Sequence, residues 1–155
     1  MPSGQGQGQG QGQLLDTAVS DRLYVEVQRF YARHMQLLDA GEAEKWAATF
    51  TEDGSFGAPT LPEPVRGRAA LTAVVRQGAN EREKAGEVHR HWHGMITVDS
   101  RPDGALDVVC YALVFVSVKG GSSRLHRVCV CRDVLVREKG ELRVRSRFVT
   151  RDDIP

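Results

Sequence analysis

The sequence has no long apolar run and no surplus of either charge. No stretch approaches the ~20 consecutive apolar residues of a membrane-spanning helix, and the N-terminus has no apolar signal core. The 21 Lys and Arg nearly balance the 20 Asp and Glu, so net charge does not steer the chain toward polyanions. These absences predict a soluble, cytoplasmic protein that partners neither membranes nor nucleic acid.

Cysteine is scarce, and common phosphate and nucleophile motifs are missing. The three cysteines are odd in number and form no CxxC pair, so they do not predict a disulfide framework. No glycine-rich phosphate loop occurs, and Gly54-Ser55 lacks the rest of a G-x-S-x-G nucleophile elbow. Function must therefore be sought in other polar residues.

The length of 155 residues suits one domain with a core and a pocket. Residues 3–13 alternate Gly and Gln after the serine at position 3, a composition that buries nothing. We expect a disordered Gly/Gln-rich tail over residues 1–15 and a single domain over residues 16–155.

Three helices are predicted in the first half of the chain. An apolar stripe with helical spacing follows Ser20, a plausible N-terminal cap, and ends near Gly41. A shorter stripe stops at a turn predicted at Glu52-Asp53-Gly54, and a third stripe precedes the polar run NEREKAG. The predicted helices cover residues 20–41, 43–50 and 69–78, and a short strand covers 55–58.

Four β-rich runs follow, at residues 88–98, 106–118, 124–137 and 141–149. The turn sequences RPDG, KGGS and EKG separate them, which predicts an antiparallel meander. Helices followed by strands predict an α+β domain: three N-terminal helices packed against a curved antiparallel sheet around a cone-shaped pocket. The sequence does not determine which side of the run 124–137 faces inward, because the residues at odd and at even positions are both largely apolar.

Histidines alternate at positions 89, 91 and 93. Alternate residues share a face of a strand, and the outer two would lie about 13 Å apart, so one ion cannot bind all three. A neighbouring pair could form a zinc site together with Cys129 and Cys131. The histidines could instead be solvated, or a single one, His91, could face the cavity as a proton carrier.

Two polar residues of the first helix each have two interpretations. A carboxylate at Asp39 meets the negative end of the helix dipole, and such departures often mark function, but Asp39-Ala40-Gly41-Glu42 also matches a capping box for the next helix. His34 lies in the apolar stripe, either as a core histidine or, with Tyr31, as a substrate contact in the roof of a cavity.

The last strand carries Arg143, Arg145 and Arg147 at alternate positions. We expect these arginines on a solvent or subunit face, and Glu52 and Asp53 in a solvated turn. An RNA-binding patch would need interleaved aromatic residues on the exposed side, and these are missing.

Several segments together resemble the NTF2-like, cone-fold superfamily over about residues 20–152: LLDAGEAEKWAATFTEDGSF, VRGRAAL, YALVFVSV, CRDVLVRE and RSRFVTRDD. RHWHG and the RDVLVRE and RFVTRDD segments look most like the branch with SnoaL-like polyketide cyclases, scytalone dehydratase and the small subunits of ring-hydroxylating dioxygenases. The resemblance implies the NTF2-like fold and a homodimer.

The resemblance also implies site residues. Scytalone dehydratase-like sequences pair an aspartate ending the first helix with a histidine opening the second strand, and Asp39 and His91 fall at these positions. The second catalytic histidine of that pattern would fall near Tyr111 and is absent. The ketosteroid-isomerase pattern does not fit, because its base would fall near Ala58 and its tyrosine near His34.

We therefore predict a dehydratase, cyclase or isomerase of secondary metabolism that acts on a polyketide-like or other cyclic ketone. His91, oriented by Asp39, would move a proton next to a carbonyl, and Tyr31 or His34 would hydrogen-bond the developing enolate, with no metal and no cofactor. The predicted substrate-binding residues are Tyr31, His34, Trp46, Phe56, His93 and Tyr111. The alternative is a non-catalytic binding or assembly protein that partners an oxygenase.

Overall fold

The computed structural model describes residues 9–155, with side chains from residue 21 onward. Its helices are α1 (Gln9–Asp39), α2 (Ala43–Ala47) and α3 (Arg68–Ala85). Its strands are β1 (Phe50–Gly57), β2 (Val65–Arg66), β3 (Glu87–Ser100), β4 (Leu106–Val118), β5 (Ser123–Glu138) and β6 (Glu141–Arg151). No helix in this part of the chain is long and apolar enough to cross a membrane.

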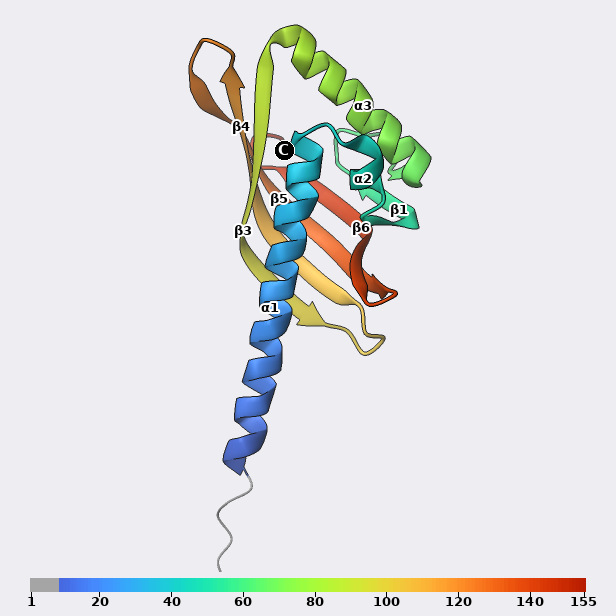
Figure 1. Ribbon diagram of the computed structural model, residues 1–155, viewed down its shortest axis with the longest axis vertical. Coiled ribbons are helices and arrows are strands. Elements are labelled where there is room, and N and C mark those ends of the chain that lie inside the picture. Colours follow the sequence, from blue (N-terminus) through green and yellow to red (C-terminus); the bar gives the residue numbers. More distant parts are fainter. Residues whose placement is uncertain (1–8) are drawn as a thin grey trace, which may run out of the picture.

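The six strands form one curved sheet in the order β2-β1-β6-β5-β4-β3 (Figure 1). The predicted meander of β3 to β6 is confirmed, and its strands pair antiparallel. The two-residue turn between β5 and β6 has Lys139 and Gly140 at positive φ, as a tight hairpin requires. β1 adds a parallel pairing with β6, so the complete sheet is mixed.

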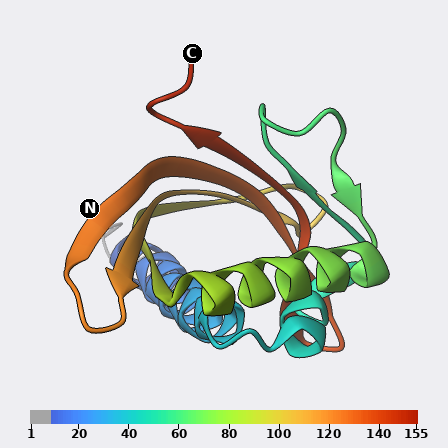
Figure 2. The same ribbon diagram turned by 90° about the horizontal axis from the view of Figure 1, so that it is seen from above.

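The helices cover the concave side of the sheet, which confirms the predicted α+β architecture. Figure 2 shows the strands arching over α3, with α2 beside it and α1 beneath β3. The core between these layers is continuous from α1 to the sheet. It contains Val27, Tyr31, Trp46, Phe50, Leu71, Val108, Leu135 and Val144.

Helix α1 ends at Asp39, close to the predicted end, and Gly41 follows at φ 72°. It begins at Gln9, before the predicted cap at Ser20. Residues 1–8 of the predicted tail lie outside the described residues, whereas residues 9–15 belong to the backbone of α1.

The second helix is shorter than predicted, and the turn predicted at Glu52-Asp53-Gly54 is wrong. Helix α2 ends at Ala47, and Phe50 instead opens β1 with a fully buried side chain. Glu52 and Asp53 are exposed, as expected, but on a strand. The apolar spacing that suggested a helix through Phe50 is created by a chain reversal, because Trp46 and Phe50 pack ring to ring from two elements.

A β-bulge in β6 overturns the prediction that Arg147 faces solvent. Val134 pairs with Ser146 and Leu135 with Val144, so one extra residue, Arg145, lies between the two pairs. An extra residue switches which parity faces the core. Arg147 is consequently 4% exposed.

A second bulge, in β5, settles which residues of that strand face inward. Arg127 pairs with Val114, and Leu125 pairs with Phe115, so His126 is the extra residue. Beyond the bulge, the inward residues are those at odd positions, with Cys129, Cys131 and Asp133 buried and Arg132 exposed.

Candidate active site

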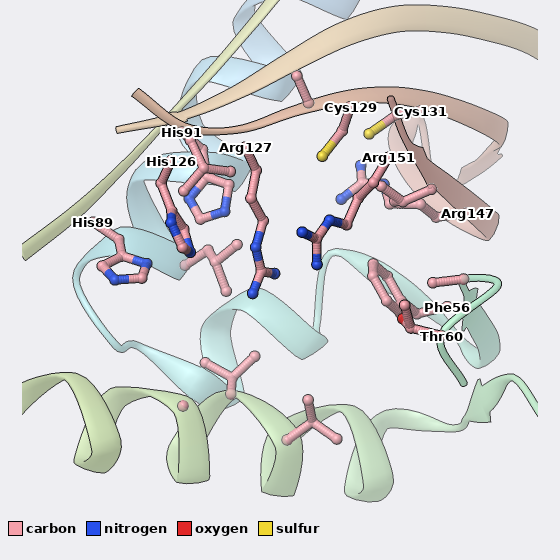
Figure 3. A pocket seen from close by; sticks show the side chains of 18 of the residues that line it. Phe56, Thr60, His89, His91, His126, Arg127, Cys129, Cys131, Arg147 and Arg151 are labelled. Atoms are coloured by element: carbon pink, nitrogen blue, oxygen red, sulfur yellow. The ribbon is translucent and has the colours of Figure 1, made fainter. Parts of the chain in front are cut away.

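A cavity of about 1050 Å³ lies between the concave face of the sheet and the helices. Figure 3 shows side chains pointing into it from the sheet, with α3 on the opposite side. A cavity of this size, mostly apolar with a few polar groups, is typical of small-molecule sites. Its polar wall contains His89, His91, His93, His126, Arg127, Arg147 and Arg151, and its apolar wall includes Leu38, Trp46, Phe56, Leu71, Val75 and Val114.

Asp39 and His91 meet at the edge of this cavity. One carboxylate oxygen of Asp39 lies 2.6 Å from the ring Nδ1 of His91, and the other accepts the backbone N–H of His91 at 3.0 Å. The end of α1 is thereby tied to the middle of β3. The capping-box interpretation of Asp39 is wrong, because Glu42 is the N-cap of α2 and no side chain caps that helix.

The pairing with Asp39 determines which nitrogen of His91 can react. A carboxylate accepts hydrogen bonds, so Nδ1 carries the proton in the neutral ring. The lone pair is then on Nε2, the other nitrogen of a side chain that lines the cavity. This arrangement orients an imidazole as a proton acceptor.

His93, two residues further along β3, also lines the cavity but has a different environment. Its Nδ1 lies 3.5 Å from the Sγ of Cys110, and its ring packs against Tyr31 at 5.1 Å between centroids. Burial, together with the charges of Arg147 and His91, lowers the pKa of His93 to about 2. His93 is therefore neutral and can donate or accept a hydrogen bond without carrying charge.

A buried ion pair lies behind these histidines. The guanidinium of Arg147 donates to both oxygens of Asp133, at 2.7 to 3.1 Å, and the Tyr31 hydroxyl donates to Asp133 at 2.7 Å. Burial opposes the charge of Arg147, but Asp133 holds the pKa of Arg147 above its ordinary value. Desolvation and the Asp133 charge raise the pKa of Tyr31 well above its usual range.

His34 completes this buried network. The Thr49 hydroxyl donates to the carbonyl of Trp46, so it accepts from Nδ1–H of His34 at 2.6 Å. The Nε2 of His34 then accepts from Arg147 at 2.8 Å. Burial and the Arg147 charge lower the pKa of His34 well below its usual range, so the ring is neutral and both nitrogens are engaged.

Three of the predicted substrate-binding residues do not line the cavity. Tyr31 and His34 belong to the buried network, because Asp133 faces inward on β5 and the bulge in β6 brings Arg147 beside it under α1. Tyr111 lies on the convex face of β4 and is 53% exposed. Its neighbours Cys110 and Ala112 are the inward residues, since alternate strand positions face opposite sides.

The predicted contacts Trp46, Phe56 and His93 do line the cavity. Sequence reasoning missed Arg127 and Arg151 as cavity residues, which Figure 3 shows pointing inward. An arginine on a strand ordinarily indicates a solvent face. Arg127 has the inward parity of Cys129 and Cys131, but this parity is not evident from β5 alone, because residues at both parities are largely apolar.

The cysteine and histidine pairs do not converge on one point. Cys129 and Cys131 lie on β5, whereas His93 contacts Cys110 of β4. Among the residues with described side chains, no group of three His, Cys, Asp or Glu is placed to hold a metal ion.

The SnoaL-like domain model matches residues 20–148 of the chain. The chain belongs to the SnoaL-like domain family. This match confirms the resemblance to the NTF2-like superfamily and to its SnoaL-like branch. Among curated proteins, none matches the chain.

Solved structures similar to this SnoaL-like chain agree with its fold. ActVI-ORFA from Streptomyces coelicolor is 36% identical, with a TM-score of 0.77 over 85% of this chain and 99% of that one. A Catenulispora acidiphila structure in complex with S-DNPA is 37% identical, with a TM-score of 0.75 over 86% and 96%. An NTF2-like protein with a cystatin-like fold from Novosphingobium aromaticivorans is 27% identical, with a TM-score of 0.73 over 90% and 91%.

Proposed function

We propose that this protein is an acid-base catalyst of the polyketide dehydratase or cyclase type, acting on a cyclic ketone of secondary metabolism. The observation that carries this proposal is the Asp39–His91 pair, held by two hydrogen bonds at the edge of a large, mostly apolar cavity. The SnoaL-like family and the structures at 36% and 37% identity support a role of this type. The S-DNPA complex of a similar chain supports a small-molecule ligand.

The shared step of these reactions is removal of a proton next to a carbonyl. The Nε2 lone pair of His91 takes the proton, and the electrons of the broken C–H bond form an enolate. In a dehydration, the enolate then expels a β-hydroxyl group, which leaves as water with the proton from His91. A positioned base of this kind contributes about 10²–10⁴-fold to the rate.

The enolate oxygen needs a hydrogen-bond donor, and His93 is suited to this role. A thiol proton of Cys110 directed at Nδ1 leaves the proton of His93 on Nε2, the other nitrogen of a side chain that lines the cavity. A neutral imidazole donor stabilises negative charge without giving up its proton, a contribution of about 10²–10³-fold. His93 takes over the role that the sequence suggested for Tyr31 or His34. The step requires no metal and no cofactor.

The proposal is tested by proton exchange, which needs no knowledge of the natural substrate. We expect the protein to accelerate deuterium uptake next to the carbonyl of 2-tetralone in D₂O, followed by NMR. The variants His91→Gln and Asp39→Asn should each lower the rate by about 10²-fold or more. Asp99→Asn, which changes an exposed carboxylate on the same strand, is the matched control and should leave the rate unchanged.

The same measurement addresses the non-catalytic alternative. A protein that binds 2-tetralone without accelerating exchange would favour a binding or assembly role beside an oxygenase. Near-wild-type exchange in both variants would remove His91 and Asp39 from the mechanism.

We also infer a homodimer that forms through the convex face of the sheet. Trp92, Tyr111, Val128 and Phe148 on four neighbouring strands are all exposed and apolar there. Large exposed apolar side chains gathered on one face are typical of interaction surfaces.

A further inference from the structure

Two arginines lie side by side on the inner face of the sheet, away from the Asp39–His91 pair. Cys129 of β5 pairs directly with Arg151 of β6, and Arg127 is two residues before Cys129. Arg127 and Arg151 are thus diagonal neighbours on adjacent strands, a spacing of about 7–8 Å that long side chains bridge easily. Figure 3 shows both guanidinium groups directed into the cavity.

Arg127 lies on the inward face of β5 because it alternates regularly with Cys129, Cys131 and Asp133. The bulge at His126 interrupts this alternation on the other side of Arg127, so Leu125 faces outward and is 50% exposed. Such bulges are common next to binding sites. The backbone is therefore locally irregular beside the charged side chain that faces the cavity.

The charges of the two arginines are incompletely balanced. Arg151 is paired with Asp153, whose side chain is largely exposed, whereas Arg127 makes no ion pair with any residue whose side chain the structure describes. Burial raises the pKa of the Cys129 thiol, and the charges of Arg127 and Arg151 oppose that rise. Both positive charges thus act on the cavity wall between them.

We propose that Arg127 and Arg151 together bind a carboxylate on the ligand. A guanidinium presents N–H donors in a planar fork that matches the two oxygens of a carboxylate. One unpaired arginine beside one already paired with Asp153 suits a single negative charge better than the double charge of a phosphate. The inference rests on the proposed function and narrows its substrate class to cyclic ketones that carry a carboxylate.

The register of the strands also orients such a ligand. His91 pairs with Val114, and Val114 pairs with Arg127, so two strand spacings, about 10 Å, separate the base from the nearer arginine. The side chain between them on the cavity floor is the apolar Val114. A flat ring system fits over this apolar stretch, with its carboxylate at Arg127 and its reacting carbon at His91.

Binding of 2-anthracenecarboxylic acid, a fluorescent three-ring carboxylate, and of its methyl ester tests this proposal by titration. We expect the wild type to bind the acid about tenfold more tightly than the ester. Arg127→Gln should remove most of this preference by weakening acid binding, and Arg127→Lys, which keeps the charge but loses the fork, should fall between. Asp153→Asn should strengthen acid binding by about threefold, because it releases Arg151.

The control is Arg132→Gln, on the outer face of the same strand, which should bind both probes as the wild type does. Equal affinity of the wild type for acid and ester would overturn the proposal, as would an Arg127→Gln protein that keeps the preference. These outcomes are independent of catalysis, because His91→Gln should lose exchange of 2-tetralone yet keep its preference for the acid. Each variant should give the circular dichroism spectrum and the thermal unfolding temperature of the wild type, which establishes that the variant is folded.

Discussion

His91 and His93 are the same residue type on the same face of one strand, and their neighbours give them different chemistry. His91 has a carboxylate on Nδ1, whereas His93 has a thiol there and lies deeper, near Arg147. The carboxylate orients His91 as a base, and burial keeps His93 neutral. Pairs of titratable groups with contrasting environments are a recurring feature of acid-base sites.

The two buried neutral histidines, His34 and His93, predict how stability depends on pH. Burial lowers the pKa of both in the folded protein, whereas the unfolded chain protonates them near pH 6.5. Below that pH the unfolded state binds more protons, so stability is present above about pH 6.5 and is lost as pH falls. We expect each histidine to lower the free energy of unfolding by about 1.4 kcal/mol per pH unit between about pH 6 and 4.5.

Urea unfolding at a series of pH values measures this dependence. His93→Gln should remove the share of one histidine from the slope. His126→Gln should change the slope by less, because His126 is exposed and burial and nearby arginines lower its pKa less than that of His93. Exposed carboxylates contribute equally to the slope in the wild type and in both variants, so the difference between the slopes reports on His93. Equal slopes for the wild type and His93→Gln would contradict a neutral, buried His93.

At the scale of the element, α3 forms the side of the cavity opposite the sheet, and two of its glycines have opposite roles. Gly78 lies inside the helix, where a Cβ would meet only the flexible end of Arg82 at 3.1 Å. Gly86 follows the helix at φ 66° and ends it in the left-handed conformation that glycine adopts without strain.

The two alanine variants should therefore change stability in opposite directions. Gly78→Ala should stabilise the protein by up to about 1 kcal/mol, because it removes glycine from a helix interior. Gly86→Ala should destabilise it by about 1 kcal/mol, because alanine is strained at positive φ, although no atom lies within 4 Å of the added Cβ. Thermal or urea unfolding measures both, and shifts of the same sign would contradict these opposite roles.

Pairing between strands also acts at this scale. Arg145 of β6 and His126 of β5 are the extra residues of two β-bulges and have no partner of their own on the neighbouring strand. At each bulge, the set of residues that faces inward changes between even and odd positions. The bulge in β6 places Arg147 in the buried network. The bulge in β5 directly precedes Arg127, which points into the cavity although its side chain is exposed to solvent.

At the scale of the whole molecule, the curved sheet separates a concave face with the cavity from a convex face with exposed aromatic residues. Trp92 is 67% exposed and Phe148 is 45% exposed. If the inferred homodimer buries this face, Trp92→Lys should convert the protein to a monomer, because a buried unpaired charge opposes association. Light scattering coupled to size exclusion measures the mass.

The control for this prediction is Val118→Lys, which changes an exposed apolar residue at the end of β4, outside the four-residue patch. It should keep the dimer. A wild-type monomer at micromolar concentration would refute the inferred dimer, and a Trp92→Lys dimer would exclude the convex face as its interface.

The sequence by itself determined the three helices of the first half, the four-strand meander and the family, and the family resemblance implied the pair of Asp39 and His91. These features depend on local periodicity, turn residues and a recognisable order of segments, all of which are visible along a single chain. Only the tertiary structure decided which side chains face the cavity. Tyr31 and His34 contact Asp133 and Arg147 because a one-residue bulge reverses the faces of β6, and Arg127 enters the cavity because it shares the inward face of Cys129 and Cys131. Such a bulge is defined by pairing with residues distant in the chain, so no local pattern predicts it.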